Sequence, residues 1–195
     1  MTAPKHDSHA PRKLFHALAA SIIPALYHLE VLPRGVIVAA VTLLAVLWIW
    51  VDSARLKLPR FNTWVMARFS FLMKKKEAHS VSGVSYLLGG TAIALLLFPP
   101  AVAVSTLFFI ALGDPAAAVI GKRFGTIKLL HGRSLQGSLA MLAVCLVVAR
   151  FIGGFAWPVS IAGALVATLA ELYSGRIDDN LMVPILAGAT MVSFG

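Results

Sequence analysis

Residues 101–121 read AVAVSTLFFIALGDPAAAVIG, a stretch of 21 residues with a single charged side chain, Asp114. An apolar stretch of about 20 residues is long enough for an α-helix to cross the hydrocarbon core of a bilayer. The whole chain has a similar composition, because 59% of its 195 residues are hydrophobic and only 13% are charged. Soluble domains carry about 25% charged residues. The sequence therefore predicts an all-α, polytopic integral membrane protein, and it excludes a disordered chain, a collagen-like chain and a disulfide scaffold.

Seven apolar runs, separated by polar or helix-breaking residues, predict a bundle of about seven transmembrane helices. The expected spans are Leu14–Leu29, Gly35–Val51, Val84–Phe98, Ala101–Gly121, Leu135–Phe151, Pro158–Tyr173 and Leu181–Phe194. We expect one membrane domain over residues 1–195, with a disordered polar tail over residues 1–11. The single cysteine, Cys145, lies within an apolar run, which indicates a role in core packing.

The basic residues predict the orientation in the membrane. With the N-terminus in the cytoplasm and seven alternating spans, fifteen of the 17 lysines and arginines fall on the cytoplasmic side, and only Arg34 and Arg150 fall opposite. Lys and Arg collect in cytoplasmic loops, so the net charge of +9 requires no nucleic acid partner. We expect a compact chain of this kind in a bacterial or archaeal plasma membrane. Nothing in the sequence indicates its oligomeric state.

Residues 52–79 are too polar to span the bilayer. Apolar and aromatic side chains recur in this segment at roughly helical spacing: Phe61, Trp64, Val65, Phe69 and Leu72. Basic residues flank them, including the run Lys74–Lys76. This pattern predicts an amphipathic helix on the cytoplasmic membrane surface. The alternative is a solvated connector that is basic only because it is cytoplasmic.

Ionisable side chains within or beside membrane spans are candidates for function, because burying them in lipid is costly. In the expected topology they all lie near the cytoplasmic ends of the spans. The candidates are Asp114, Glu171, Asp179 with its neighbours Asp178 and Asn180, His16, Glu77 and His79. This one-sided clustering indicates a single site. For the group at 178–180 the alternative is a plain helix start, with Asp179 or Asn180 as the N-cap.

A basic, glycine-rich loop follows Asp114. It contains Gly121-Lys122-Arg123-Phe-Gly125, then Lys128, and then Gly132-Arg133-Ser134-Leu-Gln-Gly137-Ser138. Glycines let backbone N–H groups approach an anion, and Lys and Arg neutralise its charge. A carboxylate beside such a loop suits a nucleotide–Mg²⁺ complex, although no Walker A motif is present. The alternative is that Gly121 and Gly125 only pack helices together.

Taken in order, these motifs resemble the CTP-dependent lipid-alcohol kinases, which include dolichol kinase, phytol kinase and the fungal-type CTP-dependent diacylglycerol kinase. The first motif is Arg12-Lys13-Leu-Phe-His16. Next comes Lys76-Glu77-Ala-His79-Ser-Val-Ser-Gly83, which most resembles the diacylglycerol kinase branch. The remaining motifs are Gly113-Asp114 through Gly125, Arg133-Ser134 with Gly137-Ser138, and Glu171 with Asp179-Asn180-Leu-x-x-Pro184. The chain departs from the family at Arg133, where Lys is usual, and at Pro115, where Thr is frequent.

The resemblance implies transfer of the γ-phosphoryl group of CTP to a membrane lipid alcohol: diacylglycerol or a polyprenol, dolichol or phytol. It implies catalytic roles for Asp114, Glu171 and Asp179, with Asp114 and Asp179 as Mg²⁺ ligands and Glu171 or Asp179 accepting the alcohol proton. The residues expected to bind CTP are Gly121, Lys122, Arg123, Gly125, Lys128, Arg133, Ser134 and Asn180. Those expected at the lipid headgroup are Arg12, Lys13, His16, Glu77 and His79.

Two other functions remain open from the residues. A CTP:phosphatidate cytidylyltransferase would need the same carboxylates, Mg²⁺ and basic loop, but it would release pyrophosphate. A small transporter should instead carry ionisable residues along a path through the whole membrane. The outer halves of the expected spans hold almost none of these residues, which favours an enzyme.

Overall fold

The computed structural model describes residues 9–69, 73, 75–175 and 178–195. These described residues form helices and connecting loops, with no strand. The helices of the N-terminal half are α1 (His9–His28), α2 (Arg34–Lys57), α3 (Pro59–Arg68), the short 3₁₀ helix η1 (Lys75–His79) and α4 (Gly83–Leu97). Those of the C-terminal half are α5 (Pro100–Phe108), η2 (Phe109–Gly113), α6 (Asp114–Phe124), η3 (Leu130–Gly132), α7 (Leu135–Val147), η4 (Val148–Ile152), α8 (Trp157–Tyr173) and α9 (Asp179–Phe194).

The all-α membrane fold predicted from the sequence is confirmed. By length and composition, three helical stretches are long and apolar enough to cross a membrane: Arg34–Lys57, Pro100–Phe124 and Leu135–Ile152. Four shorter apolar helices accompany them: Ala17–His28, Gly83–Leu97, Trp157–Tyr173 and Asp179–Phe194. These stretches coincide with the seven expected spans, while the number of crossings stays a prediction. Helix α1 begins at His9, inside the segment expected to be a tail.

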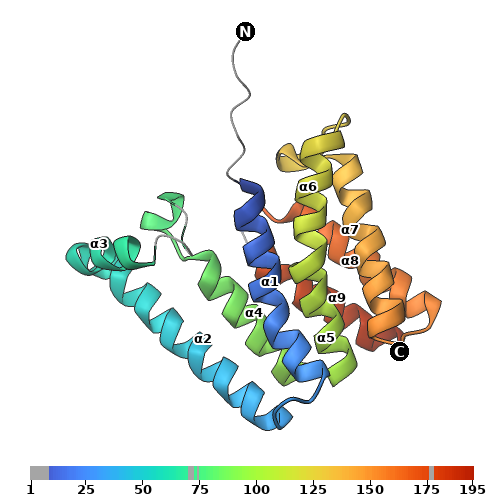
Figure 1. Cartoon of the computed structure of the whole chain (residues 1–195), viewed down its shortest axis with the longest axis horizontal. Helices are drawn as coiled ribbons and strands as arrows, with labels where there is room; N and C mark the ends of the chain where they lie inside the picture. Colours follow the sequence, from blue (N-terminus) through green and yellow to red (C-terminus); the bar gives the residue numbers. More distant parts are fainter. Residues whose placement is uncertain (1–8, 70–72, 74, 176–177) are drawn as a thin grey trace.

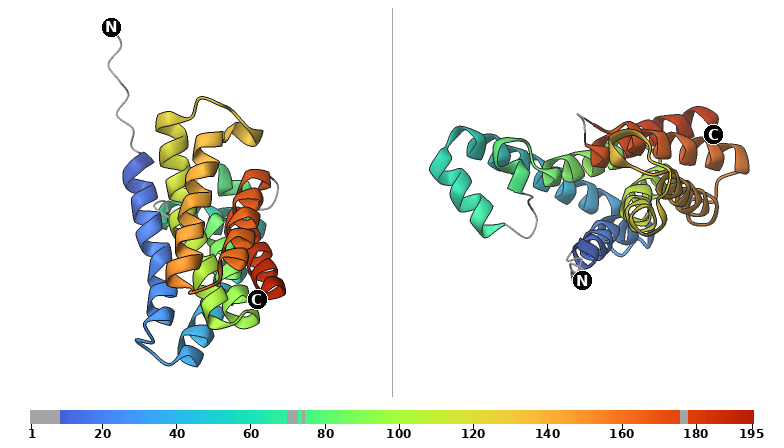
Figure 2. Two further views of the ribbon diagram at one scale, coloured as in Figure 1. Left: turned by 90° about the vertical axis from the view of Figure 1, so that its right-hand side faces the viewer. Right: turned by 90° about the horizontal axis from the view of Figure 1, so that it is seen from above.

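Successive long helices run in alternating directions, so the loops between them lie at the two ends of the bundle. Figure 1 shows the start of α1 and the end of α6 toward the top and the turn between α1 and α2 at the bottom, with α3 at the left, at the upper end of α2. Helices α5 to α9 pack together and α1 lies against α5 and α6. Helix α4 packs against α9 and joins α2 to them, whereas α2 and α3 extend to one side (Figure 2). This alternation follows from the short loops between consecutive apolar helices.

Two groups of buried side chains hold the bundle together. One is centred on Phe109, Met141, Cys145 and Met191, between α7, η2 and α9. The other includes Tyr27 and joins α1, α2, α4 and α5. Cys145 is a free, buried thiol, as its position in an apolar run predicted. Many large apolar side chains stay exposed on the outside, as expected for helices that face lipid.

The long helix from Pro100 to Phe124 contains one π-helical turn, η2, immediately before Asp114. Pro115 lacks an N–H group, and its ring clashes with the preceding turn of a regular helix, so a wider turn here relieves the strain. Gly113 makes room for α7, because a Cβ at Gly113 would lie 3.2 Å from Sγ of Cys145. The helix is therefore locally widened just before Asp114, by this π turn.

The segment from 52 to 79 differs from the single amphipathic helix expected. Helix α2 continues through Asp52 to Lys57, α3 is only 10 residues long, and η1 follows. Val65 is fully buried while Trp64 is 58% exposed. The longer α2 is stabilised by a buried Asp52–Arg55 ion pair, with Nε of Arg55 2.5 Å from Oδ1 of Asp52. The sequence predicts that the membrane span ends before Asp52 and Arg55, but these two residues are buried and paired with each other.

Candidate functional site

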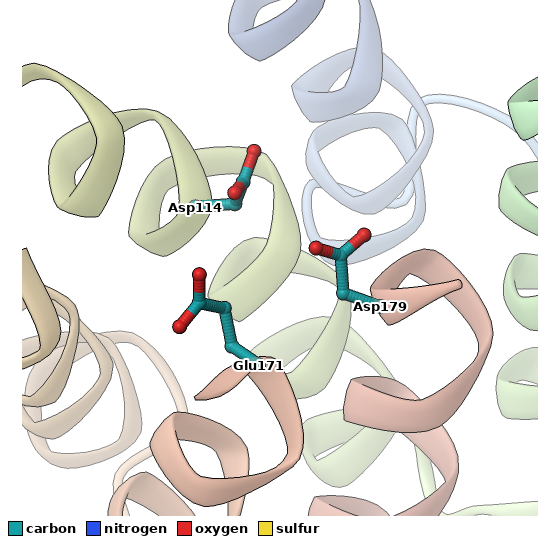
Figure 3. Close-up of side chains that lie close together, drawn as sticks. All are labelled: Asp114, Glu171 and Asp179. Carbon is teal, nitrogen blue, oxygen red and sulfur yellow. The ribbon is translucent and has the colours of Figure 1, made fainter. Parts of the chain in front are cut away.

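Three carboxylates from three different helices meet near the upper end of the bundle. Asp114 is the first residue of α6, Glu171 lies in the last turn of α8, and Asp179 is the first residue of α9. One carboxylate oxygen of each lies within 4.8 Å of the other two, and Figure 3 shows the three side chains pointing toward one another. Glu171 is buried, and the other two are partly buried. The structure thus brings together three residues that the sequence analysis expects in one site.

The start of α9 explains how Asp179 reaches the cluster. The N-cap is Asp178, whose Oδ1 accepts a hydrogen bond from the backbone N–H of Asn180 at 3.1 Å. The alternative in which Asp179 or Asn180 caps the helix is therefore wrong. Because Asp178 satisfies the helix end, the Asp179 carboxylate is left to turn toward Asp114 and Glu171. The Asn180 side chain donates to Asp178 at 2.5 Å, which places it at the cap.

Arg133 links the glycine-rich loop to α8 and α9. Its guanidinium forms an ion pair with Glu171 and another with Asp179, where Nη2 lies 3.0 Å from Oδ2. It also donates to the backbone oxygen of Glu171 and, at 3.0 Å, to Oγ of Ser174. One planar guanidinium with five N–H donors can make several such bonds at once. Arg133 therefore fixes two of the three carboxylates relative to the loop.

A pocket of about 390 Å³ opens beside the cluster, between α6, α7 and the end of α8. Its charged and polar lining residues are Asp114, Lys122, Lys128, Arg133, Ser134, Ser138 and Glu171. Small residues complete the wall: Ala117, Ala118, Gly121, Gly132 and Gly137. Carboxylates and basic side chains that line one pocket match the expected site for a nucleotide phosphate chain beside a divalent cation.

Glycines let α6 and α7 approach closely beneath this pocket. A Cβ at Gly121 would lie 2.7 Å from Oγ of Ser134, and one at Gly137 would lie 2.6 Å from the backbone oxygen of Ala117. A Cβ at Gly125 would lie 2.6 Å from the same Ser134 hydroxyl. Ser134 itself caps α7 by accepting from the N–H of Gly137 at 3.2 Å. Helix packing, the alternative role considered for Gly121 and Gly125, is therefore real, and Gly121 lines the pocket as well.

Not every predicted site residue reaches the pocket in the described part of the chain. Arg123 is exposed and stacks on the ring of Phe124, with its Cζ 5.3 Å from the ring centroid. Gly125 and Asn180 also stay outside the lining. Arg12, Lys13 and His16 belong to α1, but their side chains lie outside the described residues. Their expected contacts with a lipid headgroup stay predictions.

Glu77 and His79 lie in η1, which packs against α3; no extensive packing of η1 against α6, α8 or α9 is seen among the described residues. Arg55 holds this segment by donating to the backbone oxygens of Glu77 at 3.0 Å and Ser80 at 2.7 Å. Asp52 in turn accepts from the backbone N–H and hydroxyl of Ser82, at 2.7 Å and 3.0 Å. The expected headgroup residues are thus divided between separate parts of the structure.

Sequence reasoning missed two features of this region. It assigns Asp52 and Arg55 to a separate interfacial segment, although charges three residues apart at the end of an apolar run are a signal for an i,i+3 pair. It includes Ser138 in a motif without assigning it to the site. Ser138 lines the pocket one turn after Ser134, and this spacing on one helix face could have indicated its position.

The cluster suits a hard divalent cation. Three carboxylates this close repel one another, and among the described residues the Asp114 side chain has no hydrogen-bond or ion-pair partner. Mg²⁺ prefers carboxylate and phosphate oxygens, and it usually takes one or two protein carboxylates. Asp114 and Asp179 could supply them, while Glu171 is partly neutralised by Arg133.

Comparison with known proteins agrees with the resemblance. The chain is 31% identical to a CTP-dependent diacylglycerol kinase 1 of Eremothecium gossypii, in an alignment that covers 96% of this chain and 67% of the relative. It is 29% identical to the CTP-dependent diacylglycerol kinase 1 of Saccharomyces cerevisiae over 96% of this chain and 73% of the relative. An uncharacterized protein of Rickettsia prowazekii is 27% identical over 92% of this chain and 91% of the relative.

No family model matches the chain, and no solved structure matches it. The alignments with the two fungal kinases nevertheless span almost all of its length, which includes the helices that carry Asp114, Glu171 and Asp179. The helical membrane fold and the converging acidic and basic residues agree with these relatives. The chain therefore belongs to the family of CTP-dependent lipid kinases, in its diacylglycerol kinase branch.

Proposed function

We propose that this protein transfers the γ-phosphoryl group of CTP to the free hydroxyl of diacylglycerol at the cytoplasmic face of a membrane. The observation that carries the proposal is the meeting of Asp114, Glu171 and Asp179 beside a pocket lined by Lys122 and Lys128. The names of the fungal relatives support CTP as donor and diacylglycerol as acceptor. The other lipid alcohols considered above are alternatives for the same site.

In this proposal the carboxylates and the basic loop have different tasks. Asp114 and Asp179 hold Mg²⁺, which supplies charge neutralisation at the phosphates. Lys122, Lys128 and Arg133, which line the same pocket, neutralise the triphosphate. Glu171 or Asp179 accepts the proton of the attacking hydroxyl. Phosphoryl transfer needs mainly positioning and electrostatic stabilisation, so a cluster of charged side chains is an appropriate catalyst.

The proposed cytoplasmic location is supported by the placement of the charged residues. The start of α9 and the start of α1 lie in the same half of the bundle (Figure 1), and the segments expected on the cytoplasmic side carry most of the basic residues of the sequence. A lipid hydroxyl at headgroup level and a nucleotide from the cytoplasm would meet there. We propose accordingly that the N-terminus is cytoplasmic.

The test uses purified protein in nanodiscs with Mg²⁺ and CTP labelled on the γ-phosphate, offered separately with diacylglycerol, a polyprenol, dolichol and phytol. We expect label to enter the lipid fraction with diacylglycerol, and Asp114→Asn to abolish the transfer. Asp178→Asn is the matched control, because Asn also caps a helix and Asp178 caps α9 without being one of the three clustered carboxylates. Label in another alcohol would change the substrate, and pyrophosphate release with phosphatidate would identify a cytidylyltransferase instead.

A further inference from the structure

Ser138 has a buried hydroxyl that is not accounted for by the protein's own hydrogen bonds. The residue lies in the first turns of α7, is only 8% exposed and lines the pocket together with Asp114 and Glu171. Its Oγ has no hydrogen-bond partner among the described residues. Buried polar groups are nearly always paired, so an orphan hydroxyl in a pocket wall requires an explanation.

Other hydroxyls in this bundle show what a structural serine or threonine does. Thr91 donates to the backbone oxygen of Leu87 at 2.7 Å, and Thr168 donates to that of Ala164 at 2.8 Å. This bond to the carbonyl four residues earlier is the usual way to satisfy a hydroxyl within an apolar helix. Within the described residues Ser138 does not make it, although the backbone oxygen of Ser134 stands at the corresponding position. Its hydroxyl is therefore a buried donor without a protein partner among the described residues, in a residue that lines the pocket.

The surroundings of Ser138 indicate the charge of that group. Ser138 lies in the first turns of α7, near its N-terminus, where the helix dipole favours an anion. Lys122, Lys128 and Arg133 line the same pocket and add positive charge. Gly137 beside it lets α7 approach α6 closely, because any side chain at that position would meet the backbone of α6. An oxygen of a phosphate group is the acceptor that fits these donors.

We propose that the Ser138 hydroxyl donates a hydrogen bond to a phosphate oxygen of the bound nucleotide. The bond positions the triphosphate against the wall of α7, opposite Asp114, so Ser138 is a substrate-binding residue. This inference rests on the proposed function, and it extends that function to a residue outside the acidic cluster and outside the set of residues expected from the sequence to bind CTP.

The test compares Ser138→Ala with Ser105→Ala. Ser105 is also buried, and its hydroxyl likewise lacks a partner among the described residues, but it lies on α5 against Gly153 and away from the pocket lining. Removing an unpaired hydroxyl breaks no internal hydrogen bond, so both variants should unfold at the same temperature as the unaltered protein. Ser138→Cys, which keeps the size but is a poor donor, is a second variant for the same contact.

Binding is measured without turnover, by thermal stabilisation with the β,γ-methylene analogue of CTP and, separately, with inorganic tripolyphosphate. For Ser138→Ala and Ser138→Cys we expect Kd to rise about tenfold or more for both probes, since a hydrogen bond to a charged group is lost. Ser105→Ala should keep both affinities. With CTP as substrate and diacylglycerol as acceptor, Ser138→Ala should raise the KM for CTP similarly.

Several results would overturn the inference: unchanged affinity in Ser138→Ala, or an equal loss in Ser138→Ala and Ser105→Ala. Failure of the unaltered protein to stabilise with either probe would overturn both the inference and the proposed function. A third outcome is that the unaltered protein is stabilised by tripolyphosphate but not by the CTP analogue, and that only the Ser138 variants lose affinity for tripolyphosphate. That outcome would refute CTP as the donor and still support the phosphate contact.

Discussion

Nη2 of Arg133 lies 3.0 Å from Oδ2 of Asp179, and Nε of the same guanidinium pairs with Glu171. One side chain from the loop before α7 thus joins the end of α8 to the start of α9. Arginine stands here where related kinases usually carry lysine. A lysine ammonium has only three donors at a single point and cannot span the two carboxylates in the same way. The pairing makes Arg133 important for the shape of the site as well as for its charge.

Replacing Arg133 should therefore lower both stability and activity. Arg133→Ala leaves Glu171 buried beside Asp179 without this partner, and we expect a loss of about 3 kcal/mol in unfolding free energy. Arg133→Lys should recover part of the stability and only part of the activity. Unfolding in detergent is followed by tryptophan fluorescence, and activity by phosphoryl transfer from CTP.

Arg123→Ala is the matched control for this arginine, because Arg123 is exposed and stacks only on Phe124 within the described residues. It should change the unfolding free energy by less than about 0.5 kcal/mol. If Arg133→Lys behaved like the unaltered protein in both measurements, the bridging role of Arg133 would be refuted.

Neutralising one carboxylate of the acidic cluster should maintain or raise the stability of the protein but lower its activity. Asp114→Asn and Asp179→Asn each remove one negative charge from a group within 4.8 Å, which relieves repulsion, so stability should stay equal or rise. Phosphoryl transfer should fall by about 100-fold or more, because charge stabilisation supplies most of this catalysis. Thermal unfolding and initial rates are measured on the same preparations.

A chelator should have the same effect as these substitutions on the rate. We expect EDTA to stop transfer and added Mg²⁺ to restore it, with a weaker apparent affinity for Mg²⁺ in the Asp179→Asn variant. Full activity in EDTA would contradict a metal role for the cluster. A loss of activity accompanied by unfolding would instead make Asp114 and Asp179 structural residues.

The glycines between α6 and α7 should be intolerant of a methyl group. Gly137→Ala places a Cβ 2.6 Å from the backbone oxygen of Ala117, which a rigid helix cannot avoid. We expect a loss of about 1–3 kcal/mol from overpacking. Gly89→Ala on α4 is the control, because nothing lies within 4 Å of its Cβ position in the described part of the protein. That variant should be neutral or more stable by up to about 1 kcal/mol, and equal unfolding temperatures for the two would show that the helix contact is not tight.

The Asp52–Arg55 pair should be tested as a unit. Asp52→Asn or Arg55→Met alone leaves a buried charge without its partner, and we expect each to cost about 3–5 kcal/mol. The double variant should cost clearly less than the sum, because the two side chains are in direct contact. The four unfolding free energies form a cycle, and additive effects would show that the pair is not coupled.

Much of the site could be predicted because few ionisable residues lie in or beside the expected membrane spans. Apolar runs indicated the helices, their alternation placed Asp114, Glu171 and Asp179 at one end, and the lipid environment made each carboxylate conspicuous. What could not be predicted depends on side-chain packing between elements far apart in the chain. The partners of Arg133 lie 38 and 46 residues away, and nothing local selects them.

Local rules also had competing solutions. At 178–180 three consecutive residues can each cap a helix, and local sequence rules do not select Asp178, which is the N-cap in the structure. At the end of α2 the charged residues resemble a boundary, because the sequence does not show that Ser82 and Ser85, at the start of α4, return to bind Asp52. Whether a charged residue is buried depends on contacts with distant parts of the chain. Helix α2 therefore extends beyond the end of its hydrophobic run.

The π turn that precedes Asp114 determines the angular phase of the helix that follows. An α-helix turns by about 100° per residue, and a π turn accommodates one residue more than a regular turn does. Shortening 109–113 by one residue would restore continuous α-helical phase and rotate Asp114 by about that angle, away from Glu171 and Asp179. The acidic cluster in this protein thus depends on an insertion as well as on the identity of its side chains, and a chain with all three carboxylates but without the extra residue would lack the site.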